Sequence, residues 1–119
     1  MAFVQKRLAG PAQLTASSAA YYTVPQNTTT IVKQIVLTNT TSSAKTVTVR
    51  LKTANVGETN ADDILSSMTI GANETVAFNC SLIMNNNGSA PSASTSDQLS
   101  AFASSAASVN IAVFGVEEA

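Results

Sequence analysis

The chain has no histidine and no tryptophan, and only one of its 119 residues is a cysteine. Without histidine it lacks the usual general base and the commonest neutral metal ligand, which excludes Ser-His-Asp and Cys-His sites. A single cysteine, Cys80, cannot form an internal disulfide, so the fold must depend on packing and strand pairing. At this length we expect one domain over residues 1–119, with its own hydrophobic core.

Charge is also scarce, since Asp, Glu, Lys and Arg make up 11% of the residues and the net charge is −1. No basic stripe is interleaved with the aromatic residues, so nucleic acid is not an expected partner. Ser, Thr and Asn together form about a third of the chain. Such a surface forms short-range hydrogen bonds and suits a protein held in an assembly, although a threonine-rich β protein would show the same composition.

Long apolar runs are missing as well. The longest, such as residues 111–114, fall far short of the roughly 20 residues that cross a bilayer, so no membrane association is expected. At the N-terminus the basic pair Lys6 and Arg7 follows the apolar residues, unlike a secretory signal. We therefore expect synthesis and retention in the cytoplasm.

Alternation with a period of two is the clearest positive signal, and it is strongest in residues 45–53. There Val47 and Val49 point to one side of a strand and Thr48 to the other, which predicts one buried and one wet face. Residues 29–39 are β-branched and more continuously apolar, which is typical of a central strand. The short, turn-prone link at residues 39–44 predicts that the two strands form an antiparallel hairpin.

Six further strands are expected, separated by turn residues at Gly10-Pro11, Pro25–Asn27, Asn55–Gly57, Gly71–Asn73 and Asn85–Gly88. They are residues 4–8, 19–24, 64–70, 74–79, 98–103 and 108–116. Helix is conceivable at residues 59–62 and 100–108, but strand and turn fit both segments better. The sequence therefore predicts an all-β fold, an antiparallel β-sandwich or jelly roll of about seven to eight short strands.

No residue is expected to be catalytic, to bind a cofactor or to ligate a metal. A serine nucleophile would need a desolvated lysine, and none of Lys6, Lys33, Lys45 or Lys52 lies in a recognisable motif. Cys80 has no neighbouring cation in the sequence and is read as a small hydrophobe. The carboxylates of residues 58–63 could hold a hard cation, but they lack the glycine and distal glutamate of the helix-loop-helix calcium motif, so a solvated loop is the ordinary reading.

Every basic residue precedes every acidic one in the chain. The basic set is Lys6, Arg7, Lys33, Lys45, Arg50 and Lys52, and the acidic set is Glu58, Asp62, Asp63, Glu74, Asp97, Glu117 and Glu118. If the two sets occupied opposite faces, copies could meet head to tail through opposite charges. Alternatively, strands from both halves interleave and the charges mix.

Two segments could mediate contacts. Residues 85–96 are rich in asparagine and serine and are expected to form a long exposed loop without a core residue. Residues 1–10 could serve as an N-terminal arm that adds a strand to a neighbouring protein, or as an ordinary edge strand of their own domain.

Read as a whole, the chain resembles a family of small virion proteins encoded by tailed bacteriophages. The matching segments cover most of the chain from Ala19 onward: Tyr21–Pro25, Thr30–Asn39, Thr46–Leu51, Ile70–Thr75, Asp97–Ser100 and Ser108–Glu117. The resemblance implies a non-enzymatic structural role in the particle, as capsid decoration or as a neck or tail component, with no cofactor. It also implies synthesis in the host cytoplasm, a homo-oligomeric state and other virion proteins as partners. A carbohydrate- or receptor-binding β-sandwich module is the alternative, although the sequence lacks the tryptophan platforms typical of sugar sites.

Overall fold

The computed structural model describes residues 3–54, 63–92 and 94–118, which contain eight β-strands and no helix. The strands are β1 (Phe3–Gln13), β2 (Ala19–Thr23), β3 (Thr29–Asn39), β4 (Lys45–Lys52), β5 (Asp63–Ile70), β6 (Thr75–Asn85), β7 (Gln98–Ala103) and β8 (Val109–Glu118). The expected all-β class and strand number are confirmed.

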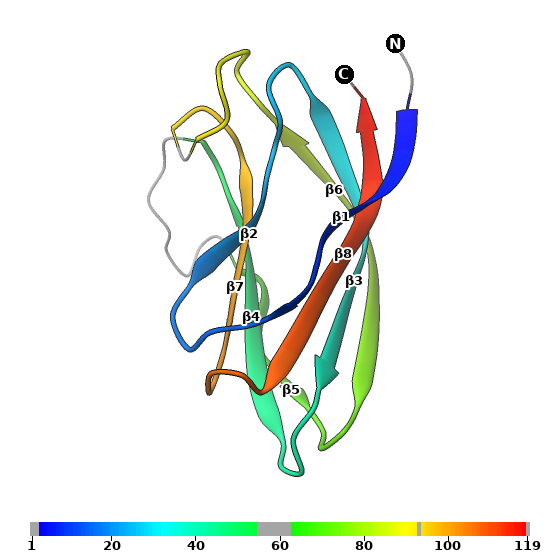
Figure 1. Cartoon of the computed structure of the whole chain (residues 1–119), viewed down its shortest axis with the longest axis vertical. Coiled ribbons are helices and arrows are strands. Elements are labelled where there is room, and N and C mark those ends of the chain that lie inside the picture. Colours follow the sequence, from blue (N-terminus) through cyan, green and yellow to red (C-terminus); the bar gives the residue numbers. More distant parts are fainter. Residues whose placement is uncertain (1–2, 55–62, 93, 119) are drawn as a thin grey trace.

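The strands form two four-stranded antiparallel sheets (Figure 1). Sheet A has the order β1-β8-β3-β6, and sheet B has the order β2-β7-β4-β5. The first strand thus pairs with the last, the second with the seventh, the third with the sixth and the fourth with the fifth. The chain is one long antiparallel ribbon, rolled so that successive pairs lie alternately in the two sheets. This arrangement is a jelly roll.

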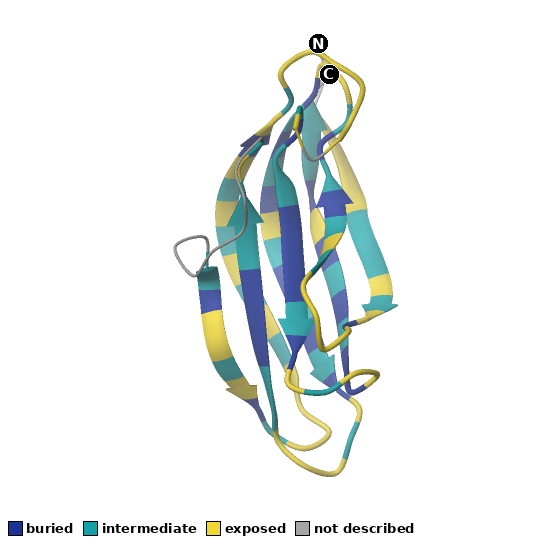
Figure 2. Ribbon diagram, turned by 90° about the vertical axis from the view of Figure 1, so that its left-hand side faces the viewer, coloured by how far each residue is buried: buried dark blue, intermediate teal, exposed yellow. Residues whose placement is uncertain are grey.

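The core lies between the sheets, and alternation along the strands fills it. The fully buried larger side chains are Leu14, Val24, Val32, Ile35, Leu37, Val47, Val49, Ile70, Met84, Leu99, Val109 and Ile111. Figure 2 shows that buried positions concentrate on the central strands, whereas exposed positions are frequent on the edge strands. All of these side chains are aliphatic except Met84, so packing alone holds this layer together.

The predicted hairpin between residues 29–39 and 45–53 is wrong, because β3 and β4 lie in different sheets. β3 is paired along its length with β6 on one side and with β8 on the other. No free edge of β3 remains for β4. The link at residues 40–44 therefore crosses from one sheet to the other, which is a feature of the jelly roll that the local turn signal does not reveal.

Two strands run further than their turn residues predicted. β1 continues through Gly10 and Pro11 to Gln13 and pairs with β8 of its own chain. A proline is tolerated there because β1 is an edge strand, and shifts in register on the β1–β8 ladder absorb the irregularity. β6 continues past Asn79 to Asn85, because exposed and half-buried residues keep alternating and keep pairing with β3.

The stretch of residues 85–96 is exposed in its middle but anchored at its ends. Asn85 ends β6, and Asn86 forms an isolated bridge with Ser96. Ser96 is fully buried, and its hydroxyl donates a hydrogen bond of 2.8 Å to the carbonyl oxygen of Val24. The prediction that the whole loop is exposed is therefore wrong at Ser96, because that hydroxyl ties this end of the loop to Val24, the residue after β2.

A polar contact between the two sheets lies at one end of the core. The hydroxyl of Tyr22, in sheet B, donates a hydrogen bond to the carboxylate of Glu117 in sheet A. It also lies 2.7 Å from the hydroxyl of Thr30, which must donate because the tyrosine proton is already used. Lys6 completes the set with an ion pair of 3.1 Å to Glu117. Burial, followed by the bond to Glu117, raises the pKa of Tyr22.

Replacing Tyr22 with phenylalanine is expected to lower the free energy of unfolding by about 1–2 kcal/mol, because Glu117 and Thr30 lose a buried partner. The raised pKa adds a dependence on pH. Above about pH 10 the unfolded chain loses the tyrosine proton while the folded chain keeps it, so stability falls as pH rises. In urea unfolding, the free energies of unfolding of the wild type and the variant should converge as pH rises from 8 to 11. A constant difference between them would contradict a buried tyrosine donor.

Candidate interaction surface

A bulge in β3 decides which side chains sheet A turns outward. The register of β3 against β8 shifts between Val32 and Gln34, so Lys33 is an extra residue on β3. Val32 and Ile35 are both fully buried, and Lys33 and Gln34 therefore both point away from the core. A lysine ammonium is thereby placed in the middle of an otherwise uncharged part of the sheet.

We call the surface of sheet A that faces away from sheet B the outer face of sheet A. It carries Gln5 and Arg7 from β1, Ala112, Phe114 and Val116 from β8, Ile31, Lys33, Gln34 and Val36 from β3, and Ala77, Asn79 and Ile83 from β6. The strand register aligns six of them in two apolar rows, Ile83 with Ile31 and Val116, and Ala77 with Val36 and Ala112. The most exposed member is Ile83, at 62%. Apolar side chains grouped in this way are typical of a contact surface.

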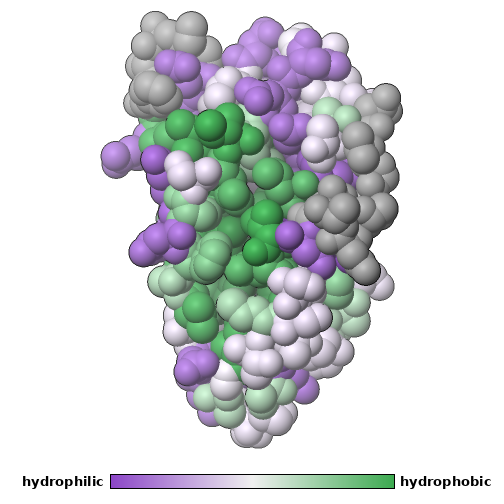
Figure 3. Space-filling model, turned by 180° about the vertical axis from the view of Figure 1, so that it is seen from behind, coloured by the Kyte–Doolittle hydropathy of each residue, from purple (hydrophilic) through white to green (hydrophobic). Residues whose placement is uncertain are grey.

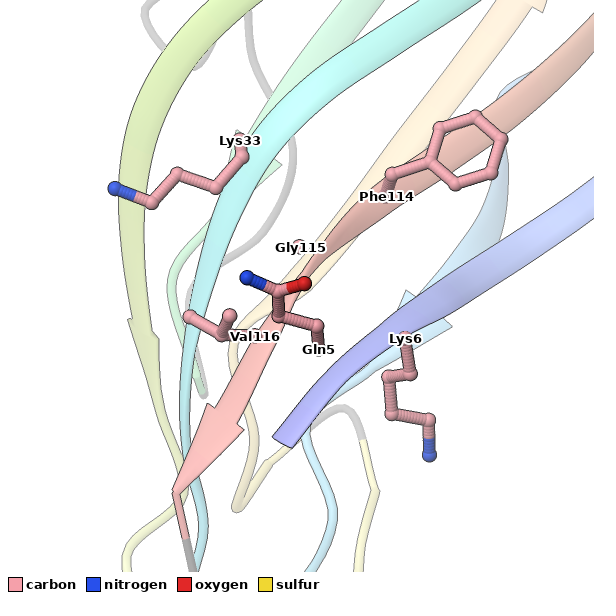
Figure 4. A pocket seen from close by; sticks show the side chains of 6 residues that line it. All are labelled: Gln5, Lys6, Lys33, Phe114, Gly115 and Val116. Carbon is pink, nitrogen blue, oxygen red and sulfur yellow. The ribbon is translucent and has the colours of Figure 1, made fainter. Parts of the chain in front are cut away.

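A hollow of about 460 Å³ lies on this face (Figure 4). Its lining is formed by Gln5, Lys6, Lys33, Phe114, Gly115 and Val116. The ring of Phe114 is 36% exposed, and the ammonium of Lys6 is engaged by Glu117. The lining offers an apolar floor, one amide and one further ammonium, which suits packing and hydrogen bonding with another molecule rather than acid–base chemistry.

A second hollow, of about 280 Å³, lies further along the same face. It is lined by Pro11, Val36, Thr38, Asn110, Ile111 and Ala112. The side-chain oxygen of Asn110 is buried and has no hydrogen-bond partner within the described part of the chain. A buried acceptor without a donor costs free energy, so a donor from a neighbouring molecule would be stabilising here.

The outer surface of sheet B has a different character. Arg50 forms an ion pair of 2.7 Å with Asp63, and its guanidinium lies 5.0 Å from the centre of the Phe102 ring. The bond from Arg50 lowers the pKa of Asp63. Thr48, predicted to face water, is 4% exposed, and its hydroxyl accepts a hydrogen bond from the backbone of Ser67. The charges of Arg50 and Asp63 thus neutralise each other, although the buried hydroxyl of Ser100 on β7 has no hydrogen-bond partner among the described residues. The outer face of sheet A exposes the large apolar side chains Ile83 and Phe114 and is therefore the better contact surface.

The idea that basic and acidic residues occupy opposite faces is wrong for Lys6 and Arg50. Lys6 pairs with Glu117 and Arg50 pairs with Asp63, so the basic first half meets the acidic second half inside one protomer. The topology explains this mixing, because β1 lies beside β8 and β4 lies beside β5. Head-to-tail assembly through opposite charges therefore loses its structural basis.

Two further candidate sites from the sequence are Cys80 and the carboxylates of residues 58–63. Cys80 is half-buried, and its Sγ lies 3.5 Å from the carbonyl oxygen of Val32. Burial raises the pKa of its thiol, as expected of a packing residue. Of the proposed cation cluster at residues 58–63, only Asp63 lies among the described residues, where it binds Arg50. Within residues 3–54, 63–92 and 94–118 no group of three His, Cys, Asp or Glu side chains is placed to hold a metal ion.

A helix able to cross a membrane is absent from the described residues.

The two tyrosines lie in the core and at its rim. Tyr22 is 8% exposed, and the hydroxyl of Tyr21 donates to the carbonyl oxygen of Gln13 at 3.3 Å. Neither tyrosine lies on the loop of residues 85–96, where a sugar-binding module would need an aromatic platform.

Sequence reasoning missed the outer face of sheet A, although a signal was present. Ile83 and Phe114 occupy positions of the alternation that should carry polar side chains, since Leu82, Met84 and Val113 fill the buried phase beside them. Apolar residues in the exposed phase of a strand are the sequence signature of a second contact surface.

Comparison with known proteins gives a likeness of fold. Neither the protein-family models nor the curated proteins contain a match to the chain. Among solved structures, a chain in the structure of infectious bursal disease virus, Gx strain, aligns over 98% of this chain with a TM-score of 0.59 and 11% identity. A chain from the Gt strain aligns with a TM-score of 0.43, also at 11% identity and over 98% of this chain. This chain spans about a third of those proteins, 32% and 28% of their lengths.

At this identity the likeness shows the fold alone: the jelly roll occurs in a chain of an animal virus structure. It assigns no role to this chain, and the resemblance to virion proteins of tailed bacteriophages rests on the sequence segments alone.

Proposed function

We propose that this chain is a non-enzymatic structural subunit of a virus particle, and that it works by contact with other virion proteins. The observation that carries the proposal is the outer face of sheet A, where two apolar rows and two hollows lie on a jelly roll. A fold does not define a function by itself, and the surface therefore provides the stronger argument. The likeness to a chain in a virus structure supports the same assignment.

The balance of forces on this face favours docking. Burial of apolar surface contributes about 25 cal/mol per Å², and the rows around Ile31 and Val36 would supply it. Gln34 and Asn79 lie between the rows, and the Nε2 of Gln34 already donates to the Oδ1 of Asn79 at 3.1 Å. Docking would therefore need partners only for the remaining groups of the two amides. Charged groups are few here, which keeps the desolvation cost of docking low.

Within this proposal we place the protein in a tailed bacteriophage, as capsid decoration or as a neck or tail component. This finer assignment rests on the sequence segments that resemble those of tailed-bacteriophage virion proteins, and not on the fold. It includes synthesis in the host cytoplasm and association between copies of the chain. A carbohydrate-binding role would need an exposed aromatic platform, and of the described aromatic side chains only Phe114 is exposed, on a sheet and not on the loop of residues 85–96.

Quantitative mass spectrometry of purified particles tests the proposal. The chain is expected to copurify with particles through a density gradient and to stay bound after a high-salt wash, because apolar contacts are insensitive to screening. Its copy number then separates the finer assignments, since hundreds of copies indicate the shell and about a dozen indicate the neck or tail. Absence of the chain from particles, while it is abundant in the cell lysate, would refute a virion role.

A further inference from the structure

The four sheet edges are not equally protected. A free edge offers unpaired N–H and C=O groups, and proteins usually block it with charges, proline, bulges or short length. β1 carries Lys6, Arg7 and Pro11, and β2 has 5 residues. β5 begins at Asp63 and contains Ser67 in a left-handed conformation, with φ of 47°. β6 is 11 residues long and has no charge, no proline and no glycine, and its irregularity is the register shift that sets Cys80 and Ser81 opposite Lys33 of β3.

The side of the sandwich at β6 is also the more open one. On the opposite side, the hydroxyl of Tyr21 on β2 bonds the backbone of Gln13 on β1, which joins the two sheets. At the β5–β6 side, core side chains are only half-buried: Val76, Phe78, Cys80 and Leu82 from β6, and Ile64 and Met68 from β5. Figure 3 views the molecule from that side and shows an apolar band along its length. The least protected edge and an apolar rim thus coincide, although Asp97 covers the Asn85 end of that edge.

We propose that two copies of this chain join along β6, antiparallel and about a two-fold axis at Cys80, so that the two A sheets form one continuous eight-stranded sheet. The free backbone groups of β6 would then pair with those of the second copy. The inference does not depend on a role in a virus, because it stands on the edge itself. A chain found in particles but monomeric in solution would contradict it and would leave the structural role in the particle intact.

The side chains of β6 support a second copy as the occupant, because their polarity is palindromic about Cys80. Antiparallel pairing over residues 76–84 sets polar against polar and apolar against apolar: Val76 with Met84, Ala77 with Ile83, Phe78 with Leu82, and Asn79 with Ser81 of the second copy. The pairing stops before Asn85, because the backbone N–H and C=O of Asn85 already bond Asp97. On the outer side this symmetry is not a consequence of alternation, since that side reads polar, apolar, polar, polar, apolar, polar. Ile83, 62% exposed in one copy, would be covered by Ala77 of the other.

Charge does not oppose this pairing. β6 carries no charged residue, so no like charges face each other across the axis. The nearest candidates are Lys33 on β3 and its counterpart in the second copy. They would be separated by three strand spacings, about 14 Å, which exceeds the screening length of about 8 Å at physiological salt.

The size of the contact sets its strength. A strand of 11 residues is about 37 Å long. Two such strands bury on the order of 800 Å² in total, which lies at the low end for specific complexes. We therefore expect a dimer that dissociates on dilution and becomes persistent only where the local concentration is high.

Charges introduced beside the two-fold axis provide one test. Asn79 and Ser81 are exposed and face each other across the proposed interface. In sedimentation velocity, the wild type is expected to shift from monomer toward dimer as concentration rises, and the double variant Asn79→Lys, Ser81→Lys to remain monomeric. Mixing it with Asn79→Glu, Ser81→Glu should restore a heterodimer, because each lysine then faces a glutamate. Circular dichroism establishes that each variant is folded. If the double lysine variant does not fold, Ile83→Lys takes its place, because it is also expected to be monomeric.

Disulfide trapping tests the register. In a Cys80→Ser background, the pair Ala77→Cys and Ile83→Cys places each cysteine opposite its partner in the second copy, within the 4.4–6.8 Å Cα separation of a disulfide. Mild oxidation should give a covalent dimer of twice the 12.2 kDa chain mass. The control pair Thr75→Cys and Ala77→Cys has no cysteine opposite and should stay monomeric.

Three results would overturn the proposal. The first is a wild type that remains monomeric at every concentration and is not trapped by the 77 and 83 cysteines. The second is a dimer that the lysine pair at positions 79 and 81 leaves intact, which would place the contact elsewhere. The third is equal trapping by the control pair at positions 75 and 77, which would show random collision instead of a defined register.

Discussion

Replacing Gly115 with alanine is expected to destabilise the fold by about 3–5 kcal/mol, because the added methyl group would overlap the neighbouring strand. A Cβ at this position would lie 2.2 Å from the carbonyl oxygen of Ile31 and 2.9 Å from Cδ1 of Leu8. The first contact is with backbone in the neighbouring strand, so it cannot be relieved by a change of rotamer. β8 would have to move away from β3, which would break the ladder at the centre of sheet A.

The matched control is Gly71→Ala, in the turn between β5 and β6. A Cβ there would lie 3.3 Å from Oε1 of Glu74, a flexible side chain that can move, so the expected change is within about 0.5–1 kcal/mol. Urea unfolding followed by circular dichroism compares the two. Equal midpoints for Gly115→Ala and wild type would mean that β8 and β3 are not packed as closely as described.

Asn39 carries the second large expected effect. It is fully buried at the end of β3, and its Nδ2 lies 2.8–3.1 Å from the carbonyl oxygens of Ser43, Ile70 and Gly71. Its Oδ1 accepts from the backbone N–H and the hydroxyl of Thr41. One side chain thus fastens the link between β3 and β4 to the end of β5, at the point where the chain changes sheets.

Truncation of Asn39 to alanine should cost about 3–4 kcal/mol, because several buried backbone groups lose their partner and a cavity remains. Asn39→Asp should cost at least as much at neutral pH, since a carboxylate would face three carbonyl oxygens, and should regain stability as acid protonates it. The control is Asn79→Ala on the outer face, expected to change stability by less than about 1 kcal/mol. An Asn39→Ala midpoint no lower than that of Asn79→Ala would contradict the structural role of this amide.

Strand positions could be read from the sequence because they depend on local alternation. Residues 29–39 and 98–103 are strands with the bounds that the sequence predicted, and Val47 and Val49 face the core as expected. The failures lie at strand ends that tertiary contacts decide. β1 runs past Pro11 because its ladder is needed on only one side, and β6 runs past Asn79 because β3 continues beside it.

Sheet membership could not be read in the same way. The turn-prone link after Asn39 is compatible with a hairpin or with a crossing between sheets, and the choice depends on β8, which lies some 70 residues further along the chain and occupies the edge of β3. The bulge at Lys33 is also set by pairing with distant strands. Long-range pairing thus determines the contact surface. Its signal in the sequence is the pair of apolar residues Ile83 and Phe114 at strand positions that point away from the core.

A cryo-electron microscopy map of the particle at a resolution that traces β-strands tests the role of the outer face of sheet A most directly. The chain should appear with Ile31, Val36 and Phe114 buried against a neighbouring protein. Density that places this face in solvent, with the chain held through other surfaces, would contradict the assignment of sheet A as the contact surface. A particle without any density for the chain would contradict the structural role itself.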